Sequence, residues 1–318
     1  MKVLVTGGTG LVGSAIRKVV DNSDDYVFVS SKHADLRNPL AITQLFARYA
    51  PTHVIHLAAR VGGIFANMRN NLGFFQDNLQ MNMNVVRACH EFKVERAIFC
   101  LSTCIFPANA QLPLTESQLH DGPPHSSNEG YAYSKRMLEC MVRYYRKAYG
   151  YQGWQCIVPT NIYGPHDNFD VETGHVIPSL IHRCFLANNA SSGKFSVAGS
   201  GAPLRQFIYS IDLAKLIVQL IASGRCVRDE DLCVICCDSK SERAISEIAD
   251  MIAAEMGFVG TIEFDTSQAD GIERKTADNS KLLSLIGQDF AFTTLHDGIR
   301  ETCGWFRSAV SSGDVTRL

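Results

Sequence analysis

The 318-residue sequence has no excess of either charge and no long apolar run, and each absence excludes a class of protein. Its 30 lysines and arginines stand against 32 acidic residues, for a net charge of -2, and the basic residues are scattered. A nucleic-acid-binding protein concentrates basic residues against the phosphate backbone, so we expect no nucleic-acid partner. A membrane-spanning helix needs about 20 consecutive apolar residues, so we also expect no membrane partner.

The sequence also lacks the signals of secretion and of metal binding. An apolar run begins directly after Met1 and Lys2, with no charged leader or cleavage site, and we therefore expect a cytoplasmic address. The 11 cysteines are spread along the chain, and we interpret them as reduced and mostly buried. Cys236 and Cys237 are adjacent and have no spaced second pair, so we expect no metal site.

What is present is a repeating pattern of short apolar runs and helical segments. Hydrophobic residues make up 46% of the chain and charged residues 19%, enough apolar surface for a large core. Candidate strands lie at 3–6, 26–30, 53–58, 97–101 and 155–160. Their alternation with helices predicts an α/β fold, a doubly wound parallel sheet of the Rossmann type. Loops rich in Gly, Asn and Ser interrupt this pattern later, so we expect a dinucleotide-binding domain over 1–165 and a smaller C-terminal α/β substrate domain over 166–318.

A glycine-rich turn follows the first candidate strand, and an amphipathic segment follows the turn. In such a unit one glycine permits the tight turn, a second lets the backbone approach a pyrophosphate, and a third lets the helix pack closely on the sheet. The helix N-terminus then holds the anion. The pattern predicts dinucleotide binding by Gly7, Gly8, Thr9, Gly10, Leu11, Val12 and Gly13.

The end of the second candidate strand bears on which nicotinamide cofactor binds. A carboxylate about 20 residues beyond the glycines binds the adenosine ribose and repels a 2′-phosphate, but strand 26–30 is followed by Ser31 and Lys32. Lys32 is a cation suited to a 2′-phosphate, so the sequence predicts NADP(H). The acidic Asp35 lies close by, which leaves NAD as the alternative.

Three polar residues predict reduction of a ketone. Tyr131 and Lys135 lie four residues apart on a predicted helix and share one face, and an ammonium group there lowers the pKa of a phenol. Ser102 follows the strand at 97–101, at the sheet edge where ligands collect. Tyr131 then protonates the carbonyl oxygen, Ser102 hydrogen-bonds the same oxygen, and Lys135 holds the nicotinamide ribose. A solvated Tyr/Lys surface pair is the alternative, which Ser102 disfavours.

With these motifs the sequence resembles the extended short-chain dehydrogenase/reductase family, and within it the GDP-sugar 3,5-epimerase/4-reductases. The resemblance runs through nearly the whole chain. Its most specific pieces are Val-Gly-Gly-Ile and Leu-Ser-Thr-Cys-Ile-Phe-Pro at 61–64 and 101–107, and the segments at 159–169 and 174–178. It implies a two-step, NADPH-dependent conversion of GDP-4-keto-6-deoxy-D-mannose to GDP-L-fucose, by 3,5-epimerisation and then 4-keto reduction.

The resemblance also implies roles for residues beyond the reductase set. Epimerisation beside a ketone needs a base and an acid on opposite faces, roles implied for Cys104 and His175, with Cys104 as the base and the reverse assignment still open. The substrate residues it implies are Arg183, Arg205 and Asp270, two cations for the diphosphate and a carboxylate for the guanosine. The resemblance implies that the cofactor contacts the glycine turn, Lys32 and the reductase set. It implies ten further cofactor-binding residues: Asp35, Leu36, Ala58, Ala59, Leu101, Pro159, Thr160, Asn161, Ile162 and His175.

Architecture follows from the resemblance as well. The C-terminal half is expected to return to the nucleotide domain through segments near 207–240. A homodimer is expected through two amphipathic helices predicted at 76–92 and 132–149, although core burial explains their apolar stripes equally well.

Two other functions fit the same fold. An epimerase or dehydratase with tightly held NAD would carry acidic partners next to Ser102, where this chain has Thr103 and Cys104. A non-catalytic nucleotide sensor would have lost Tyr131 or Lys135, and both are present.

Overall fold

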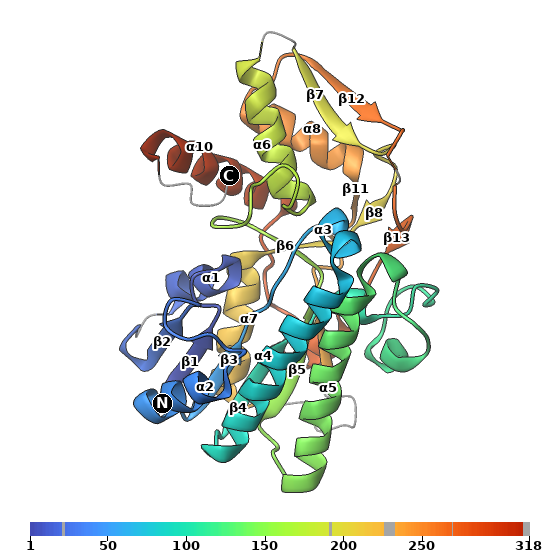
Figure 1. Cartoon of the computed structure of the whole chain (residues 1–318). Coiled ribbons are helices and arrows are strands. Elements are labelled where there is room, and N and C mark those ends of the chain that lie inside the picture. Colours follow the sequence, from blue (N-terminus) through green and yellow to red (C-terminus); the bar gives the residue numbers. More distant parts are fainter. Residues whose placement is uncertain (21–22, 191–192, 226–232, 269, 314–318) are drawn as a thin grey trace.

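Figure 1 shows a computed structural model of the chain, which describes residues 1–20, 23–190, 193–225, 233–268 and 270–313. Its centre is a six-stranded sheet in the order β10-β5-β4-β3-β1-β2, with every neighbouring pair parallel. This confirms the predicted doubly wound sheet. The six strands are β1 (Val3–Thr6), β2 (Tyr26–Val29), β3 (His53–His56), β4 (Arg96–Cys100), β5 (Trp154–Pro159) and β10 (Cys233–Cys236).

Helices cover both faces of the sheet because successive strand side chains point to opposite sides. Leu4 packs in one cluster with Phe46 and Leu138, whereas its neighbour Val5 packs in a second cluster with Leu213. The helices of the first face are α2 (Pro39–Tyr49), α4 (Asn71–Glu91) and α5 (Glu129–Tyr149). Those of the second are α1 (Leu11–Val19), α7 (Ser210–Ser223) and α9 (Ser280–Ile286).

Two elements from the C-terminal half belong to this central layer. Helix α7 packs against α1, and β10 pairs with β5 at the edge of the sheet. Residues 226–232, which fall inside the expected returning segment at 207–240, lie outside the described residues. The boundary between residues 165 and 166 stays a prediction.

The remaining elements gather beyond the carboxyl ends of the strands, at the top of Figure 1. A third core cluster, which includes Ile181, Phe195, Ile252 and Phe306, holds them together. They are α6 (Val176–Asn189), α8 (Ile245–Met256), α10 (Leu295–Ser312), and the paired strands β7 (Lys194–Ala198) and β12 (Thr261–Asp265).

Short strands and one short helix lie between the two groups (Figure 1). Strand β6 (Asn161–Tyr163) pairs with β9 (Phe207–Tyr209). Strand β8 (Leu204–Arg205) lies between β11 (Arg243–Ala244) and β13 (Arg274–Lys275). Helix α3 spans Ile64–Arg69. In the described part of the chain, no helix combines the length and the apolar character needed to cross a bilayer.

Candidate active site

The glycine turn forms a tight connection between β1 and α1. Gly7 adopts a positive φ of 71°, and the Gly10 amide donates to the Gly7 carbonyl over 3.0 Å. A Cβ at Gly13 would lie 2.5 Å from the Gly7 oxygen, whereas a Cβ at Gly10 would meet that oxygen at 3.4 Å and no other neighbour. Helix α1 begins without a side-chain cap and without an acidic residue in its first turn. Its N–H groups therefore suit the pyrophosphate of a dinucleotide.

The loop after β2 carries two basic residues, Lys32 and Arg37, and Arg37 pairs with an acidic residue of the same loop. Lys32 is exposed. Both oxygens of Asp35 accept from Arg37 at 3.0 Å, and the hydrogen bonds from Arg37 lower the pKa of Asp35. Arg37 also reaches Asp77 at 3.1 Å. The Asp35 charge is thus balanced by Arg37 within the loop, and the role predicted for Lys32 stays a prediction. Leu36 is buried.

Strand β3 is tied to β1 through a buried histidine. His56 Nδ1 lies 2.7 Å from Thr6 Oγ1, and its Nε2 lies 3.0 Å from Asn82 Oδ1. Burial, followed by the charge of Lys135, lowers the pKa of His56 to about 3. The Ala58 amide donates to the same Thr6 hydroxyl over 3.3 Å. This chain of bonds fixes the exit of β3, where the small residues Ala58 and Ala59 follow.

Ser102 and Cys104 lie on one tight turn at the carboxyl end of β4. A 3-10 helix, η2, spans Thr103–Ile105, and the Ser102 hydroxyl caps it by accepting from the Cys104 amide over 3.4 Å. The next strand, β5, ends beside this turn and is followed by Thr160 and Asn161. The Leu101 amide bonds to β5 through the Ile157 carbonyl. The end of β4, the end of β5 and the start of β6 thereby carry seven predicted residues: Leu101, Ser102, Cys104, Pro159, Thr160, Asn161 and Ile162.

Lys135 reaches the same edge from α5. It is 1% exposed, and its Nζ donates to the Cys100 carbonyl over 2.7 Å while lying 5.8 Å from the centre of the Tyr131 ring. We expected this ammonium to lower the pKa of Tyr131, and that expectation was wrong for the free protein. Burial raises the pKa of Tyr131 well above its usual value, with the charges of Cys104 and Cys100 as further causes. Tyr131 is therefore a neutral phenol that carries its proton.

The sequence interpretation missed a cation that acts on Cys104. Burial raises the pKa of the Cys104 thiol, and Lys275 is the first of the groups that oppose this. Lys275 lies on β13 in register with Arg205 on β8, and burial lowers its own pKa. The available signal was its position five residues after Asp270 in the same short segment.

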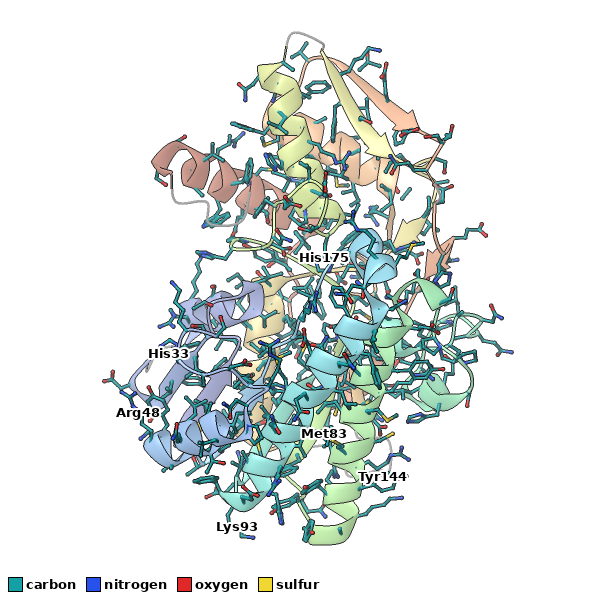
Figure 2. All side chains as sticks on the ribbon, viewed as in Figure 1. His33, Arg48, Met83, Lys93, Tyr144 and His175 are labelled. Carbon is teal, nitrogen blue, oxygen red and sulfur yellow. The ribbon has the colours of Figure 1, made fainter. Side chains whose placement is uncertain are left out.

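A cavity of about 300 Å³ lies between the carboxyl edge of the sheet and the C-terminal elements that gather beyond it. His175 lines it from the residue that precedes α6, and Figure 2 places His175 at the junction of the two groups of elements. The Gly63 amide donates to the Thr173 carbonyl over 3.0 Å, which holds the 61–64 segment against the His175 loop. The predicted residues that line this cavity are Asn161, Ile162, His175, Arg205 and Asp270.

The three predicted substrate residues have different surroundings. Burial lowers the pKa of Arg205, whose Nη1 donates to the Leu204 carbonyl over 2.8 Å. Asp270 accepts from the amide and hydroxyl of Ser200 at 2.6 and 2.8 Å, and these bonds lower its pKa. Arg183 donates to the Val171 carbonyl over 2.8 Å and is not among the residues that line the cavity. The structure thus brings Arg205 and Asp270 together and leaves Arg183 to one side.

One group of possible metal ligands lies outside this site. His120, Glu139 and Cys140 bring their ligand atoms within 4.8 Å of one another. The Arg143 guanidinium already occupies that place, 3.1 Å from the Glu139 carboxylate and 3.4 Å from the Cys140 sulfur. The expected absence of a metal stays a prediction.

Comparison with known proteins gives concordant matches. The model of the NAD dependent epimerase/dehydratase family matches residues 3–236. The chain is 46% identical to a GDP-L-fucose synthase of Dictyostelium discoideum, over 96% of this chain and 94% of the relative. It is 43% identical to a probable GDP-L-fucose synthase of Drosophila melanogaster, over 96% and 97%. A crystal structure of a GDP-L-fucose synthetase from Naegleria fowleri bound to NADP superposes with a TM-score of 0.89 at 41% identity, covering 98% of this chain and 95% of that one.

Proposed function

This chain belongs to the NAD dependent epimerase/dehydratase family, and we propose that it is an NADPH-dependent GDP-L-fucose synthase. It converts GDP-4-keto-6-deoxy-D-mannose to GDP-L-fucose by 3,5-epimerisation followed by 4-keto reduction. The main support is that residues assigned to reduction and to epimerisation lie together at the end of β4. Ser102 and Cys104 share one turn, and Cys104 interacts electrostatically with Tyr131. A reductase set and a candidate carbon acid/base group thus lie close together. Relatives named for this activity support it.

NADP(H) is the cofactor, and its proposed cradle consists of the glycine turn and the strand exits. The N–H groups at the start of α1 would bind the pyrophosphate, and Lys32 would pair with the 2′-phosphate. Lys135 holds the nicotinamide ribose, and the exits of β3, β4 and β5 line the rest of the cradle. When bound, NADPH supplies the hydride for reduction at C4.

Epimerisation is assigned to Cys104 and His175. Cys104 removes the proton α to the ketone, and His175 returns a proton from the opposite face. The Ser102 and Tyr131 hydroxyls donate to the carbonyl oxygen, which becomes negative as the enolate forms. Burial disfavours the thiolate of Cys104, and the charge of Lys275 favours it, so Lys275 helps to supply the deprotonated form that this step needs.

Reduction uses the same oxyanion site. The raised pKa of Tyr131 keeps its proton in place at neutral pH, so the phenol would be able to donate this proton to the C4 oxygen during reduction. Ser102 positions that oxygen. Arg205 is assigned to the diphosphate and Asp270 to the guanosine, and Arg183 contributes to diphosphate binding only if its bond to Val171 is exchanged for one to the substrate.

The function is tested by mixing the purified protein with GDP-4-keto-6-deoxy-D-mannose and NADPH, following the loss of reduced cofactor and identifying the sugar product. Wild type yields GDP-L-fucose. Cys104→Ser binds NADPH as wild type does but forms no GDP-L-fucose, and Tyr131→Phe loses NADPH oxidation. No reaction, together with NAD retained through purification, would contradict this function and favour an epimerase or dehydratase.

The proposed assembly is a homodimer that buries the outer faces of α4 and α5. These helices pack against each other and leave Met83, Met137 and Tyr144 at 47%, 38% and 62% exposure; Figure 2 shows Met83 and Tyr144 on the two adjacent helices. Apolar side chains grouped in this way favour a protein partner. Light scattering gives twice the 35.1 kDa chain mass if the dimer forms, and the double variant Met83→Glu/Tyr144→Glu shifts the protein to monomer.

The proposed subcellular location is the cytosol. The ten cysteines within the described ranges are all free thiols, as is usual in reducing compartments. A fluorescent fusion confined to an oxidising compartment would contradict this assignment.

A further inference from the structure

Two consecutive basic residues of α5 hold the two ends of the turn that carries Ser102 and Cys104. Lys135 donates to the Cys100 carbonyl, just before the turn, over 2.7 Å. Arg136 Nε donates to the Ile105 carbonyl, at the end of the turn, over 2.5 Å. Neighbouring residues on a helix point about 100° apart, which lets this pair grip both ends of one short segment.

Arg136 is an unusual residue to find in this position. Its side chain is 5% exposed, yet a guanidinium keeps its charge under all ordinary conditions. Within the described ranges its Nη2 is buried and has no hydrogen-bond partner. Its guanidinium carbon lies 5.6 Å from the centre of the Tyr133 ring. A buried charge with an unpaired donor is costly. The hydrogen bond that Arg136 makes among the described residues is to the turn that carries Cys104.

The Arg136 charge and the Cys104 thiol lie near enough to interact, since Cys104 is one of the groups that raise the pKa of Arg136 against the effect of burial. Other groups that act on Cys104 come from three elements. Lys275 faces it from β13, Lys135 and Tyr131 from α5, and Ser102 from its own turn. Ser102 bonds to the backbone of η2 at its start, through the Cys104 amide, and Arg136 bonds to it at its end, through the Ile105 carbonyl.

We propose that Arg136 is a positioning residue for Cys104, which fixes the thiol for proton abstraction by holding the Ile105 carbonyl. The inference deepens the proposed function and rests on it for the reaction that is affected. Loss of the bond frees the end of η2, so that Cys104 is misplaced while the cofactor site, held through Lys135, is retained. A displacement of about 1 Å at a reacting group costs on the order of 100-fold in rate.

The test compares Arg136 with a matched arginine on the same helix. Arg146 also donates from α5 to a backbone carbonyl, that of Trp154 over 2.8 Å, but at the opposite end of the sheet. The variants are Arg136→Met and Arg136→Lys, with Arg146→Met and Arg146→Lys as controls. Epimerisation is isolated by omitting NADPH and following exchange of the substrate C3 and C5 protons with D₂O by NMR.

The expected result is selective. Arg136→Met slows exchange about 100-fold and Arg136→Lys about 10-fold, since lysine keeps the charge but not the forked geometry. The Arg146 variants stay within about 2-fold, and NADPH affinity stays within about 2-fold in all four. If Arg136→Met fails to bind NADPH because it does not fold, Arg136→Lys decides. Exchange within about 2-fold of wild type in that variant, or equal slowing in the Arg146 variants, overturns the proposal.

A second readout needs no substrate. The rate of Cys104 alkylation by iodoacetamide, quantified by peptide mass spectrometry across pH, reports the thiolate at this position. Arg136→Met changes this profile, because the freed end of η2 moves the thiol relative to Lys275, Ser102 and Lys135, the groups that favour its thiolate, whereas Arg146→Met leaves the profile unchanged. An alkylation profile of Arg136→Met that matches wild type in both rate and midpoint overturns the proposal. If wild type exchanges no substrate protons, the proposed function fails, and the alkylation profile still tests the role of Arg136 on its own.

Discussion

The ammonium nitrogen of Lys135 lies 2.7 Å from the carbonyl oxygen of Cys100. This bond fastens α5 to the end of β4, two residues before Ser102, so the helix that carries Tyr131 and the turn that carries Ser102 form one unit. Both hydroxyls assigned to the substrate oxygen are thereby held at a fixed separation before substrate binds, which is what stabilisation of a developing oxyanion requires.

Lys135→Met breaks this unit. The Cys100 carbonyl loses its donor, and the cation assigned to the nicotinamide ribose is removed. We expect kcat/KM for NADPH oxidation to fall by about 100-fold or more, the usual scale for removing a group from an acid/base set. Steady-state kinetics with NADPH fluorescence titration measure this. A variant within a few-fold of wild type would show that Lys135 holds neither the cofactor nor the tyrosine.

Gly13→Ala tests the close packing of the glycine turn. The added methyl would lie 2.5 Å from the Gly7 carbonyl oxygen, so the turn must shift, at a cost of about 1 to 3 kcal/mol of stability, and NADPH affinity falls with it. Gly304→Ala is the control, since a Cβ there meets nothing within 4 Å and lies inside helix α10, where alanine stabilises by about 0.5 to 1 kcal/mol. Urea unfolding of both variants checks the opposite signs.

His56 makes folding stability depend on pH. Its pKa is about 3 in the folded protein against an ordinary value of 6.5, so below pH 6.5 the unfolded chain binds a proton that the folded chain does not. Stability is therefore complete above pH 6.5 and falls as the pH decreases toward 3, by about 1.4 kcal/mol per unit from this group. His56→Gln removes that slope. Unfolding curves between pH 7 and 5 for both proteins measure it, and parallel curves would contradict a neutral buried His56.

Lys32→Ala tests the choice of cofactor. Loss of the cation assigned to the 2′-phosphate raises the KM for NADPH about 10-fold and leaves that for NADH unchanged. Arg48→Ala is the control, because Arg48 is a surface cation elsewhere in the fold, near the Tyr49 ring and labelled in Figure 2. Equal effects of Lys32→Ala on both cofactors would place the 2′-phosphate elsewhere, with the network of Asp35, Arg37 and Asp77 as the next candidate.

Local pattern predicted the central sheet well and the electrostatics of the site poorly. The strand expected at 97–101 is β4 at Arg96–Cys100, and the helix expected at 132–149 is α5 at Glu129–Tyr149, since hydrophobic periodicity is a property of adjacent residues. Desolvation is not such a property. The pKa of Tyr131 rises because the folded chain surrounds it, and neighbours along the chain do not reveal how deeply a phenol is buried.

Cations that act on Cys104 from distant segments escaped the sequence interpretation for a related reason. Lys275 comes from a short strand more than 150 residues further along the chain, and its position depends on the pairing of β13 with β8. Arg136 adjoins Lys135 in the sequence, but its significance lies in the Ile105 carbonyl that it reaches. Neither contact has a periodic signature, so both required the fold.

The most direct test of the central claim is the full reaction in D₂O with NADPH, followed by NMR of the isolated nucleotide sugar. The account predicts GDP-L-fucose that carries deuterium at C3 and C5 and the cofactor-derived hydrogen at C4, because both chemistries use the one site around Ser102 and Cys104. A reduced 6-deoxy sugar with the original configuration and no deuterium at C3 and C5 would contradict it, and would leave a reductase in which Cys104 and His175 have no catalytic part.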